Sequence, residues 1–290
     1  MSLAEKFLCP AKVNLFLKVL GKRPDGYHEI STLMQPVSLC DEMLVEIENG
    51  SGVEVICSAN EIPSGPSNLA YKAAELFLKK TGIGKKVKLS IVKHIPVGAG
   101  LGGGSSDAAT VLIALNSMTG AGVSEDALMR RGAQLGSDAP FFILKSSALA
   151  AGRGTELKRV TLPRYHYVLV NPGFPVSTAW AYNNLDLTKI AQDYNLSHSA
   201  LALSSPDNEG ALKRLLINDL ETATIAAHPV LARLKDTLLD NGADGALMSG
   251  SGPTVFGVFV DRDSAAAAFE TIKRGLGDGM KIFLAEGQGG

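Results

Sequence analysis

Residues 95–107 read IPVGAGLGGGSSD, and an apolar segment, residues 108–118, follows them without a break. Five of the seven residues from 98 to 104 are glycines, which allow positive backbone angles and a close approach to a ligand. The apolar segment is predicted to be a helix, and Ser105, Ser106 or Asp107 is expected to cap it. Because the N-terminus of a helix favours an anion, the stretch predicts a loop that binds phosphate.

Three other interpretations of this loop are weaker. Gly98, Gly100 and Gly103 match the GxGxxG pattern of dinucleotide-binding proteins, but that fold needs an acidic residue at a strand end about 20 positions later. Glu125 and Asp126 stand near that distance, and they begin a predicted helix instead. A Walker A loop needs a lysine after its last glycine, and none stands there. A flexible linker would have polar flanks on both sides.

The composition excludes several classes of protein. The 290 residues carry a net charge of −1 and no run of lysine or arginine longer than two, so no surface for a nucleic acid is predicted. The three cysteines are widely separated, which indicates neither disulfides nor a zinc site and fits a reducing compartment. Neither a signal peptide nor an apolar run of about 18 residues is found. We therefore expect a cytoplasmic protein that does not enter a membrane.

The first half of the chain mixes predicted strands and helices. Residues 12–19 alternate between two faces, which predicts a half-buried strand on which Lys12 and Asn14 point the same way. Further strands are predicted at residues 43–47, 53–57, 87–92 and 141–144, and helices at residues 69–80 and 125–135. Asp138 falls in the short connection between the second of these helices and the last strand.

The second half predicts helices layered on an antiparallel sheet. We expect a boundary that divides the chain into domains of residues 1–162 and 163–290. The second domain is predicted to contain strands at residues 165–170, 246–248, 254–260 and 281–285, and helices at residues 229–239 and 264–274. Residues 186–210 are rich in Ser, Asn and Asp and predict a variable helical or loop region.

Separated segments of the chain together resemble the GHMP small-molecule kinases. They are PAKVN at residues 10–14, RPDGYH at residues 23–28, the glycine loop, LGSDAPFF at residues 135–142 and MSGSG at residues 248–252. The resemblance implies an α+β fold of two domains, an N-terminal one of the ribosomal protein S5 domain 2-like type and a C-terminal ferredoxin-like one, with the active site in the cleft between them. Ala139 and Ser249 depart from the family, which more often has valine and threonine there, and neither departure removes a functional group.

The same resemblance implies that the glycine loop wraps the phosphates of ATP with its backbone N–H groups. The residues so assigned are Pro96, Val97, Gly98, Ala99, Gly100, Leu101, Gly102, Gly103, Gly104, Ser105 and Ser106. Ser105 or Ser106 is the hydroxyl expected near Mg²⁺, whose other ligands are not predicted. A second glycine-rich turn is expected to close over the phosphates, although taken alone it is an ordinary tight connection between strands. It consists of Ser249, Gly250, Ser251 and Gly252.

By the resemblance, Asp138 is the general base that takes the proton of the substrate alcohol, and Lys12 lies beside it. A positive charge nearby favours the ionised carboxylate, and Lys12 is also expected to contact the transferred phosphoryl group. A free aspartate is a weak base, so Asp138 is expected mainly to orient the hydroxyl and to accept its proton late in the reaction. Taken alone, Asp138 would be an ordinary turn residue and Lys12 a solvated strand lysine.

Within these kinases, PAKVN, RPDGYH and LGSDAPFF resemble the branch that acts on a cytidine-containing alcohol. The resemblance therefore implies that the substrate is 4-diphosphocytidyl-2-C-methyl-D-erythritol, phosphorylated by ATP at its C2 hydroxyl in the non-mevalonate isoprenoid pathway. The resemblance assigns Tyr27 to stacking on the cytosine and His28 to hydrogen bonding its edge. A second aromatic ring over the base is assigned to Tyr182, with Trp180 as an alternative. Asn14 and Thr178 complete the predicted substrate site.

Two alternatives to this function remain open at the level of the sequence. One is another GHMP kinase, of the homoserine or mevalonate type, which would have no use for a cytosine pocket at RPDGYH. The other is a nucleotide-binding protein without catalytic activity, which would not need both Lys12 and Asp138. A dinucleotide-dependent oxidoreductase ranks third. We expect a monomer or weak homodimer whose partners are the small-molecule substrate and ATP.

Overall fold

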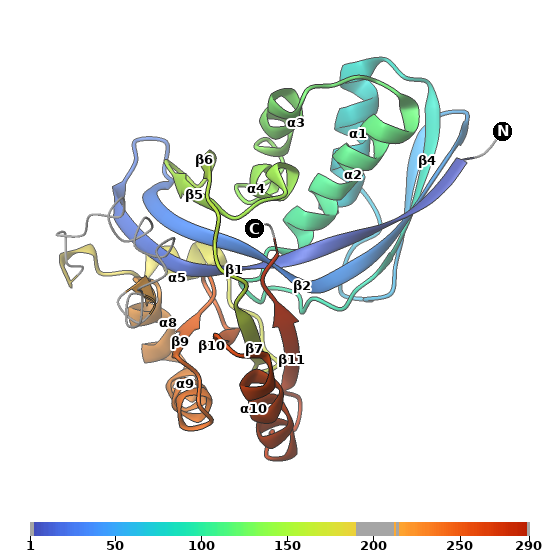
Figure 1. The fold of residues 1–290 in the computed structure, drawn as a ribbon. Coiled ribbons are helices and arrows are strands. Elements are labelled where there is room, and N and C mark those ends of the chain that lie inside the picture. Colours follow the sequence, from blue (N-terminus) through green and yellow to red (C-terminus); the bar gives the residue numbers. More distant parts are fainter. Residues whose placement is uncertain (1–2, 190–211, 213–214, 289–290) are drawn as a thin grey trace. The chain divides into compact units, whose positions relative to one another are not determined.

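The protein is described by a computed structural model, which covers residues 3–189, 212 and 215–288 (Figure 1). The chain forms two compact units. The first unit comprises residues 1–11, 40–95 and 102–145, and the second comprises residues 12–39, 96–101 and 146–290. The predicted variable region lies outside the described residues from residue 190 onward. None of the described helices has the length and hydrophobicity that crossing a bilayer would need.

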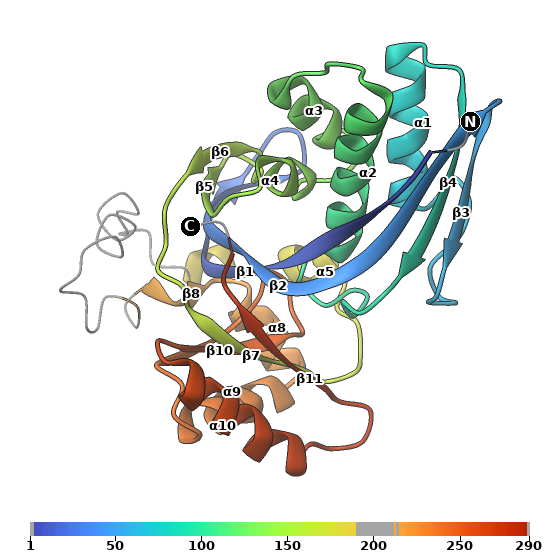
Figure 2. The ribbon, with the colours of Figure 1, turned by 45° about the vertical axis from the view of Figure 1, so that its right-hand side comes forward.

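The first unit is a sheet with helices packed against it (Figure 2). Its strands, in spatial order, are β3 (Gly52–Cys57), β4 (Lys85–Val92) and the parts of β2 (His28–Asn49) and β1 (Leu3–Lys22) that belong to this unit. Its helices are α1 (Leu69–Thr81), α2 (Gly103–Thr119), α3 (Glu125–Gly132) and α4 (Ala139–Leu144). Helix α1 packs on α2 and on strands β3 and β4, and α2 packs on α4.

Local signals explain most boundaries in this unit. The predicted helix at residues 69–80 is confirmed as α1. Asn68 caps it by accepting from the amide of Ala70 at 2.8 Å, and Gly82 ends it in a left-handed conformation. The predicted helix at residues 125–135 begins after its Ser124 cap and ends earlier, at Gly132. The strands predicted at residues 43–47, 53–57 and 87–92 are confirmed within β2, β3 and β4.

The strand predicted at residues 141–144 is wrong, because these residues belong to helix α4. A run of four apolar residues fits a buried strand and a buried helix equally well. Pro140 decides between them, because proline is favoured in the first turn of a helix, where its missing N–H costs no hydrogen bond. Every residue of α4 is buried, so the helix has no polar face that would have indicated its period.

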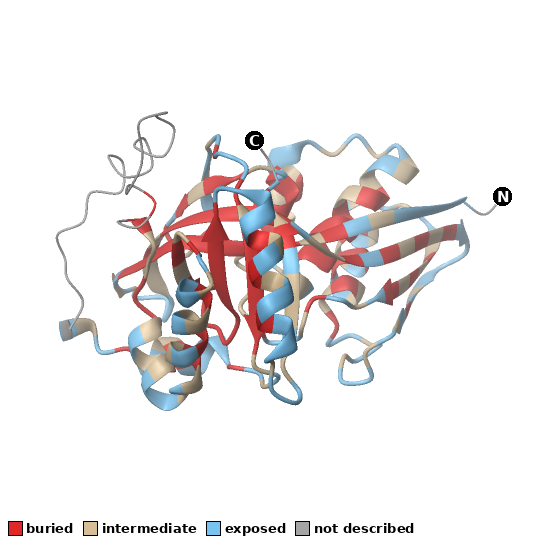
Figure 3. Ribbon diagram, turned by 60° about the horizontal axis from the view of Figure 1, so that its bottom comes forward, coloured by how far each residue is buried: buried red, intermediate tan, exposed pale blue. Residues whose placement is uncertain are grey.

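The second unit contains a four-stranded antiparallel sheet in the order β11 (Lys281–Glu286), β7 (His166–Asn171), β10 (Val255–Phe259) and β9 (Gly245–Met248). Helices α9 (Val230–Asp240) and α10 (Arg262–Arg274) pack against it and expose their other faces (Figure 3). The two central strands, β7 and β10, are buried almost throughout. This arrangement confirms the helices and the antiparallel sheet predicted for the second half of the chain.

The second unit also contains its parts of β1 and β2 and several short elements. The short elements are β5 (Ala148–Ala151), β6 (Glu156–Arg159), α5 (Thr178–Asn183), the 3-10 helix η1 (Leu187–Lys189), β8 (Ile217–Asn218) and α8 (Glu221–Ala227). Strand β8 pairs with β1 in parallel, and β5 pairs with β2 and with β6.

Strand β1 is not half-buried as predicted, because both of its faces are covered in the second unit. Leu17 and Val19 belong to the apolar core, whereas Lys12 and Lys18 on the other face have polar partners. A lysine can be buried when its charge is paired. The alternation of apolar and polar residues in β1 therefore did not mean that the polar face was exposed to solvent. The boundary between residues 162 and 163 stays a prediction.

Candidate functional site

Lys12 is a buried lysine with a fixed ammonium group in the second unit. Its Nζ donates to Asn14 Oδ1 at 2.6 Å and to the carbonyl oxygen of Gly100 at 2.9 Å. The amide of Asn14 in turn donates to Thr32 Oγ1 at 2.9 Å. These bonds confirm that Lys12 and Asn14 share a face of β1, and they rule out a solvated strand lysine. The ammonium is held in one position, as charge stabilisation during catalysis requires.

The second glycine-rich turn packs directly on the first half of the glycine loop. Ser249 Oγ donates to the carbonyl oxygen of Gly100 at 2.9 Å, so this carbonyl accepts from both Ser249 and Lys12. A Cβ added at Gly250 would lie 3.2 Å from Lys12 Nζ and 3.4 Å from Asn14 Oδ1. Three separate segments of the second unit therefore meet at Gly100: strand β1, the glycine loop and the second glycine-rich turn.

The N-terminus of α2, in the first unit, lies at the other end of the glycine loop. Gly102 precedes the helix with φ +75°, and no side chain caps it. The caps predicted from Ser105, Ser106 and Asp107 are wrong, because all three residues lie inside the first turns of α2. The first N–H groups of a helix have no partner within it, and without a side-chain cap they suit an anionic ligand.

The two predicted Mg²⁺-neighbouring serines differ in burial. Ser106 is fully buried, and among the described residues its hydroxyl has no hydrogen-bond partner. Ser105 is half-buried, and its Oγ lies 3.0 Å from where a Cβ on Gly136 would stand. Ser105 therefore has the more accessible of the two hydroxyls, and which serine contacts Mg²⁺ stays a prediction.

Asp138 immediately precedes α4 in the first unit. It is half-buried, and its side chain does not cap its own helix. Helix α4 packs on α2, so Asp138 and Ser105 belong to adjacent elements. Asp138 therefore stands in a turn, as its local sequence predicts, and its catalytic role stays a prediction. Lys12 lies in the second unit, so the predicted proximity of Lys12 to Asp138 and the predicted cleft between the domains stay predictions.

Aromatic side chains of the second unit form a group at the predicted cytosine site. The rings of His28 and Tyr182 are stacked, with centroids 4.9 Å apart and an angle of 24° between their planes. Trp180, the alternative to Tyr182, lies instead near His228. Tyr27 is half-exposed, and the guanidinium of Arg153 stands 5.3 Å above its ring. Thr178 Oγ1 lies 3.0 Å from Ser251 Oγ, which joins this group to the second glycine-rich turn.

Burial lowers the pKa of His28, and the positive charge of Lys22 lowers it further. The imidazole is therefore neutral at neutral pH, with one nitrogen that donates and one that accepts a hydrogen bond. This protonation state suits the edge of an uncharged base.

A buried charge cluster that sequence reasoning missed lies beside the glycine loop in the first unit. Lys93 Nζ donates to Asp107 Oδ2 at 2.7 Å and also pairs with Asp41, while Asp41 Oδ1 accepts from the amides of His94 and Ile95 at 2.6 and 2.8 Å. Lys93 precedes the loop and Asp107 follows it, so the cluster ties the two ends of the loop together. The sequence contained one indication that Asp41 is buried. By the two-residue period of a strand, Asp41 lies on the same face of β2 as Met43, Val45 and Ile47, which are buried.

The charged groups of this cluster shift one another's pKa values. Burial raises the pKa of Asp107 to about 6, and the ammonium of Lys93 opposes that shift. Burial lowers the pKa of Lys93, but the two carboxylates more than offset it, so this pKa lies above its ordinary value. Lys93 is therefore charged, and it compensates two carboxylates that have almost no access to water.

We expect Lys93→Met to lower the free energy of unfolding by about 3–5 kcal/mol, because it leaves buried carboxylates without their countercharge. Urea denaturation followed by circular dichroism measures the change. Lys86→Met is the matched control, because Lys86 is an exposed lysine paired with Glu48 at 3.0 Å and solvent screens that pair. Equal losses in the two variants would show that the cluster does not stabilise the fold.

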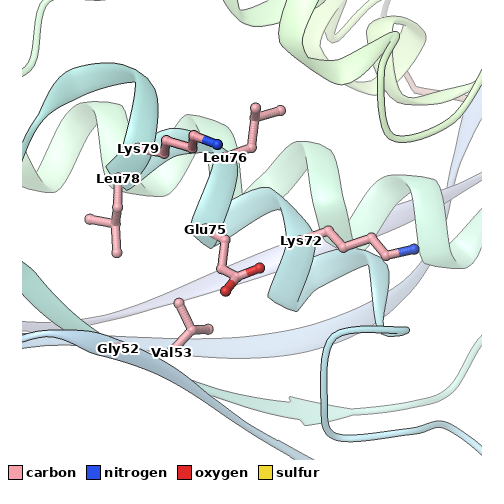
Figure 4. A pocket seen from close by; sticks show the side chains of 7 residues that line it. All are labelled: Gly52, Val53, Lys72, Glu75, Leu76, Leu78 and Lys79. Atoms are coloured by element: carbon pink, nitrogen blue, oxygen red, sulfur yellow. The ribbon is translucent and has the colours of Figure 1, made fainter.

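A pocket of about 500 Å³ lies between α1 and β3 in the first unit (Figure 4). It is lined by Gly52, Val53, Lys72, Glu75, Leu76, Leu78 and Lys79. Its charged lining residues are exposed, and none of its residues belongs to the predicted site. Among the described residues, no group of three or more His, Cys, Asp or Glu side chains could hold a metal ion.

Comparison with known proteins decides the family. The family models described as GHMP kinases N terminal domain and GHMP kinases C terminal match residues 68–146 and 196–278. A 4-diphosphocytidyl-2-C-methyl-D-erythritol kinase from Syntrophotalea carbinolica is 48% identical over 283 residues, 97% of this chain and 98% of that protein. The chain belongs to the GHMP kinase family. A relative of the same name from Geobacter sp. is 48% identical to this GHMP kinase over 94% of the chain and 95% of that protein.

Solved structures agree with this assignment. A crystal structure of 4-(cytidine 5'-diphospho)-2C-methyl-D-erythritol kinase matches this GHMP kinase with a TM-score of 0.84 and 36% identity, over 99% of this chain and 100% of that chain. Homoserine kinase from Cytophaga hutchinsonii matches with a TM-score of 0.74 at 21% identity, over 100% of this chain and 96% of that chain, which shows the fold alone. The predicted two-domain α+β GHMP kinase fold is confirmed. This GHMP kinase is an ATP-dependent small-molecule kinase, so the oxidoreductase alternative is excluded.

Proposed function

We propose that this kinase transfers the γ-phosphoryl group of ATP to the C2 hydroxyl of 4-diphosphocytidyl-2-C-methyl-D-erythritol in the non-mevalonate isoprenoid pathway. The observation that carries the proposal is the identity of nearly one half, over almost the full length, to relatives named for this substrate. The products are the 2-phosphate of the substrate and ADP. We place the enzyme in the cytoplasm as a monomer or weak homodimer, with domains at residues 1–162 and 163–290.

Residues 96–106 bind the phosphates of ATP in this proposal. The uncapped N-terminus of α2 supplies N–H groups, and Gly102, which has a left-handed backbone and no side chain, immediately precedes that helix. When bound, Mg²⁺ neutralises charge on the phosphate oxygens, and Ser105 is the residue that would contact it. A single hydroxyl fits this role, because Mg²⁺ bound to a nucleotide takes most of its ligands from phosphates and water.

The proton of the C2 hydroxyl passes to the carboxylate of Asp138 as the new oxygen–phosphorus bond forms and the bond to the leaving ADP breaks. Phosphoryl transfer demands positioning and charge stabilisation more than covalent chemistry from the protein. Lys12 supplies a fixed positive charge for the transferred group, and Asn14 holds that ammonium at 2.6 Å. Ser249, Gly250, Ser251 and Gly252 close over the phosphates.

The cytosine binds among the aromatic residues of the second unit. Tyr182 and His28 already lie in a stacked arrangement, so an aromatic base can extend the stack at little cost in side-chain ordering. The neutral imidazole of His28 offers a donor and an acceptor to the edge of the base. Tyr27 presents a half-exposed ring for stacking, and Thr178 lines the same site.

A coupled ADP-release assay with ATP and Mg²⁺ tests the proposal. We expect turnover of the cytidine-containing alcohol and none of 2-C-methyl-D-erythritol 4-phosphate, mevalonate or homoserine, because these lack the base that the aromatic group binds. Turnover of mevalonate or homoserine would retain the kinase and reject the substrate. Absence of turnover with every alcohol, together with intact ATP binding, would instead indicate a nucleotide-binding protein without catalysis.

A further inference from the structure

Residues 218–221, Asn-Asp-Leu-Glu, connect β8 to α8 in the second unit, and we call them the 218–221 brace. Asn218 is 4% exposed and Asp219 is 7% exposed. Polar side chains are buried this deeply only when their hydrogen-bonding groups have partners. The partners of these two residues come from two separate parts of the candidate site.

On one side the brace holds strand β1. The carboxylate of Asp219 accepts from the amide of Val19 at 2.8 Å and lies 3.3 Å from Lys18 Nζ. Its own amide donates to the carbonyl of Leu17 at 3.0 Å. Strand β1 is thereby fixed five to seven residues after Lys12, on the strand that carries both Lys12 and Asn14.

On the other side the brace holds the second glycine-rich turn. The single Nδ2 of Asn218 donates to the carbonyl oxygens of Met248 and Gly250, each at 2.8 Å, and these two carbonyls flank Ser249. A carboxylate oxygen of Glu221 accepts from the amide of Met248 at 2.8 Å. Thr224, one turn of α8 further on, donates from its hydroxyl to the carbonyl of Ser251 at 3.4 Å.

The side chain of Asn218 is fully engaged. Its Oδ1 accepts from the amide of Leu220 at 3.0 Å, so both N–H groups and the carbonyl oxygen of the amide have partners. Removing this side chain leaves two buried carbonyls without their donors, and the turn is free to move to satisfy them elsewhere.

Strand β1 and the second glycine-rich turn, which the brace holds on its two sides, meet at Lys12. Gly250 is a partner of Asn218, and a Cβ placed on it would lie 3.2 Å from Lys12 Nζ. A shift of the turn by 1 Å therefore displaces the atoms around the ammonium. Displacements of that size in an active site cost about 100-fold in rate.

We propose that the 218–221 brace is a positioning element that locks the Ser249–Gly252 turn onto strand β1, with Asn218 as its central residue. The brace sets the geometry around Lys12, and the turn that it holds also reaches the aromatic group through Ser251, whose hydroxyl lies 3.0 Å from Thr178 Oγ1. This inference rests on the proposed function, because it assigns phosphoryl transfer to Lys12 and to the turn.

The test is Asn218→Ala, assayed for kcat and KM with ATP and the alcohol that the wild-type enzyme phosphorylates. We expect kcat to fall about 10-fold to 100-fold, with a much smaller change in KM for the alcohol. Amide hydrogen exchange supplies a readout that needs no substrate. The amides of Ser249 and Gly252, bonded to Thr254 and Ser249 carbonyls, are expected to exchange faster in the variant.

Asn241→Ala is the matched control, because Asn241 in the same unit donates its Nδ2 to the carbonyl of Thr237 at 2.8 Å. It is expected to keep the wild-type kcat. Unchanged kcat in Asn218→Ala, or a fall in kcat that only follows the fraction of unfolded protein, would overturn the inference. A wild-type enzyme that phosphorylates a different alcohol would reject the proposed substrate and still allow this comparison.

Should Asn218→Ala fail to fold, Thr224→Val gives the same test in a milder form. It removes only the hydroxyl that bonds the Ser251 carbonyl from a fully buried position. We expect a smaller fall in kcat, again larger than any change in KM for the alcohol. Wild-type kcat in a Thr224→Val enzyme whose turn amides exchange faster would overturn the inference.

Discussion

Asp138→Asn is expected to lower kcat by about two to four orders of magnitude, the usual contribution of a positioned acid or base. The amide keeps the shape of the side chain but cannot accept the proton of the C2 hydroxyl. Because Asp138 does not cap α4, the substitution leaves that helix intact. Steady-state kinetics measures kcat, and calorimetric titration is expected to give the wild-type affinity for ATP.

The control for this variant is Asp126→Asn, which removes one carboxylate from an exposed position in the first turn of α3, in the same unit. We expect it to retain the wild-type kcat. Near-normal turnover of a folded Asp138→Asn enzyme would mean that the charge of Asp138 is not needed and that its carboxylate does not accept the proton.

Gly100→Ala is expected to abolish most activity and to destabilise the second unit. A Cβ at this position would stand 2.0 Å from the carbonyl oxygen of Ser249, and the backbone has φ +74°, which costs an alanine about 1–2 kcal/mol. The loop and the turn must move apart, and Lys12 Nζ then loses the Gly100 carbonyl that lies 2.9 Å away. We expect kcat to fall by at least about 100-fold.

Thermal unfolding and steady-state kinetics together check this prediction, and Gly84→Ala serves as its control. A Cβ at Gly84 meets nothing within 4 Å, and the backbone there is not left-handed. The control is expected to unfold and to turn over as the wild type does. A Gly100→Ala enzyme with wild-type kcat would show that contact between the loop and the second glycine-rich turn is not required for phosphoryl transfer.

Elements with local signals could be predicted from the sequence. Helix α1 has its Asn68 cap and its terminal glycine, and α9 and α10 have one apolar and one polar face. Helix α4 and the burial of β1 could not be predicted in this way. In both cases the deciding factor was what packs around the segment, and periodicity within the segment does not contain that information.

The candidate site likewise has features that the sequence predicted and features that depended on the tertiary structure. The period of a strand places Lys12 and Asn14 on one face, and the structure confirms it with a bond of 2.6 Å. The burial of Lys12 required the carbonyl of Gly100, which stands 88 positions away in the sequence. The roles of Asp138, Tyr27 and Thr178 in catalysis and binding remain predictions, and Asp138→Asn tests the first of them.

The sequence by itself determined the family, most of the helices and strands, and which residue types are available for phosphate and base binding, because caps, periods and glycine-rich motifs act over a few neighbouring residues. Only the tertiary structure decided that Lys93 bridges Asp41 and Asp107 and that Asn218 ties Met248 to Gly250. Such groups are brought together by the burial of distant segments against one another. A buried polar group must then find its partner wherever the fold places one.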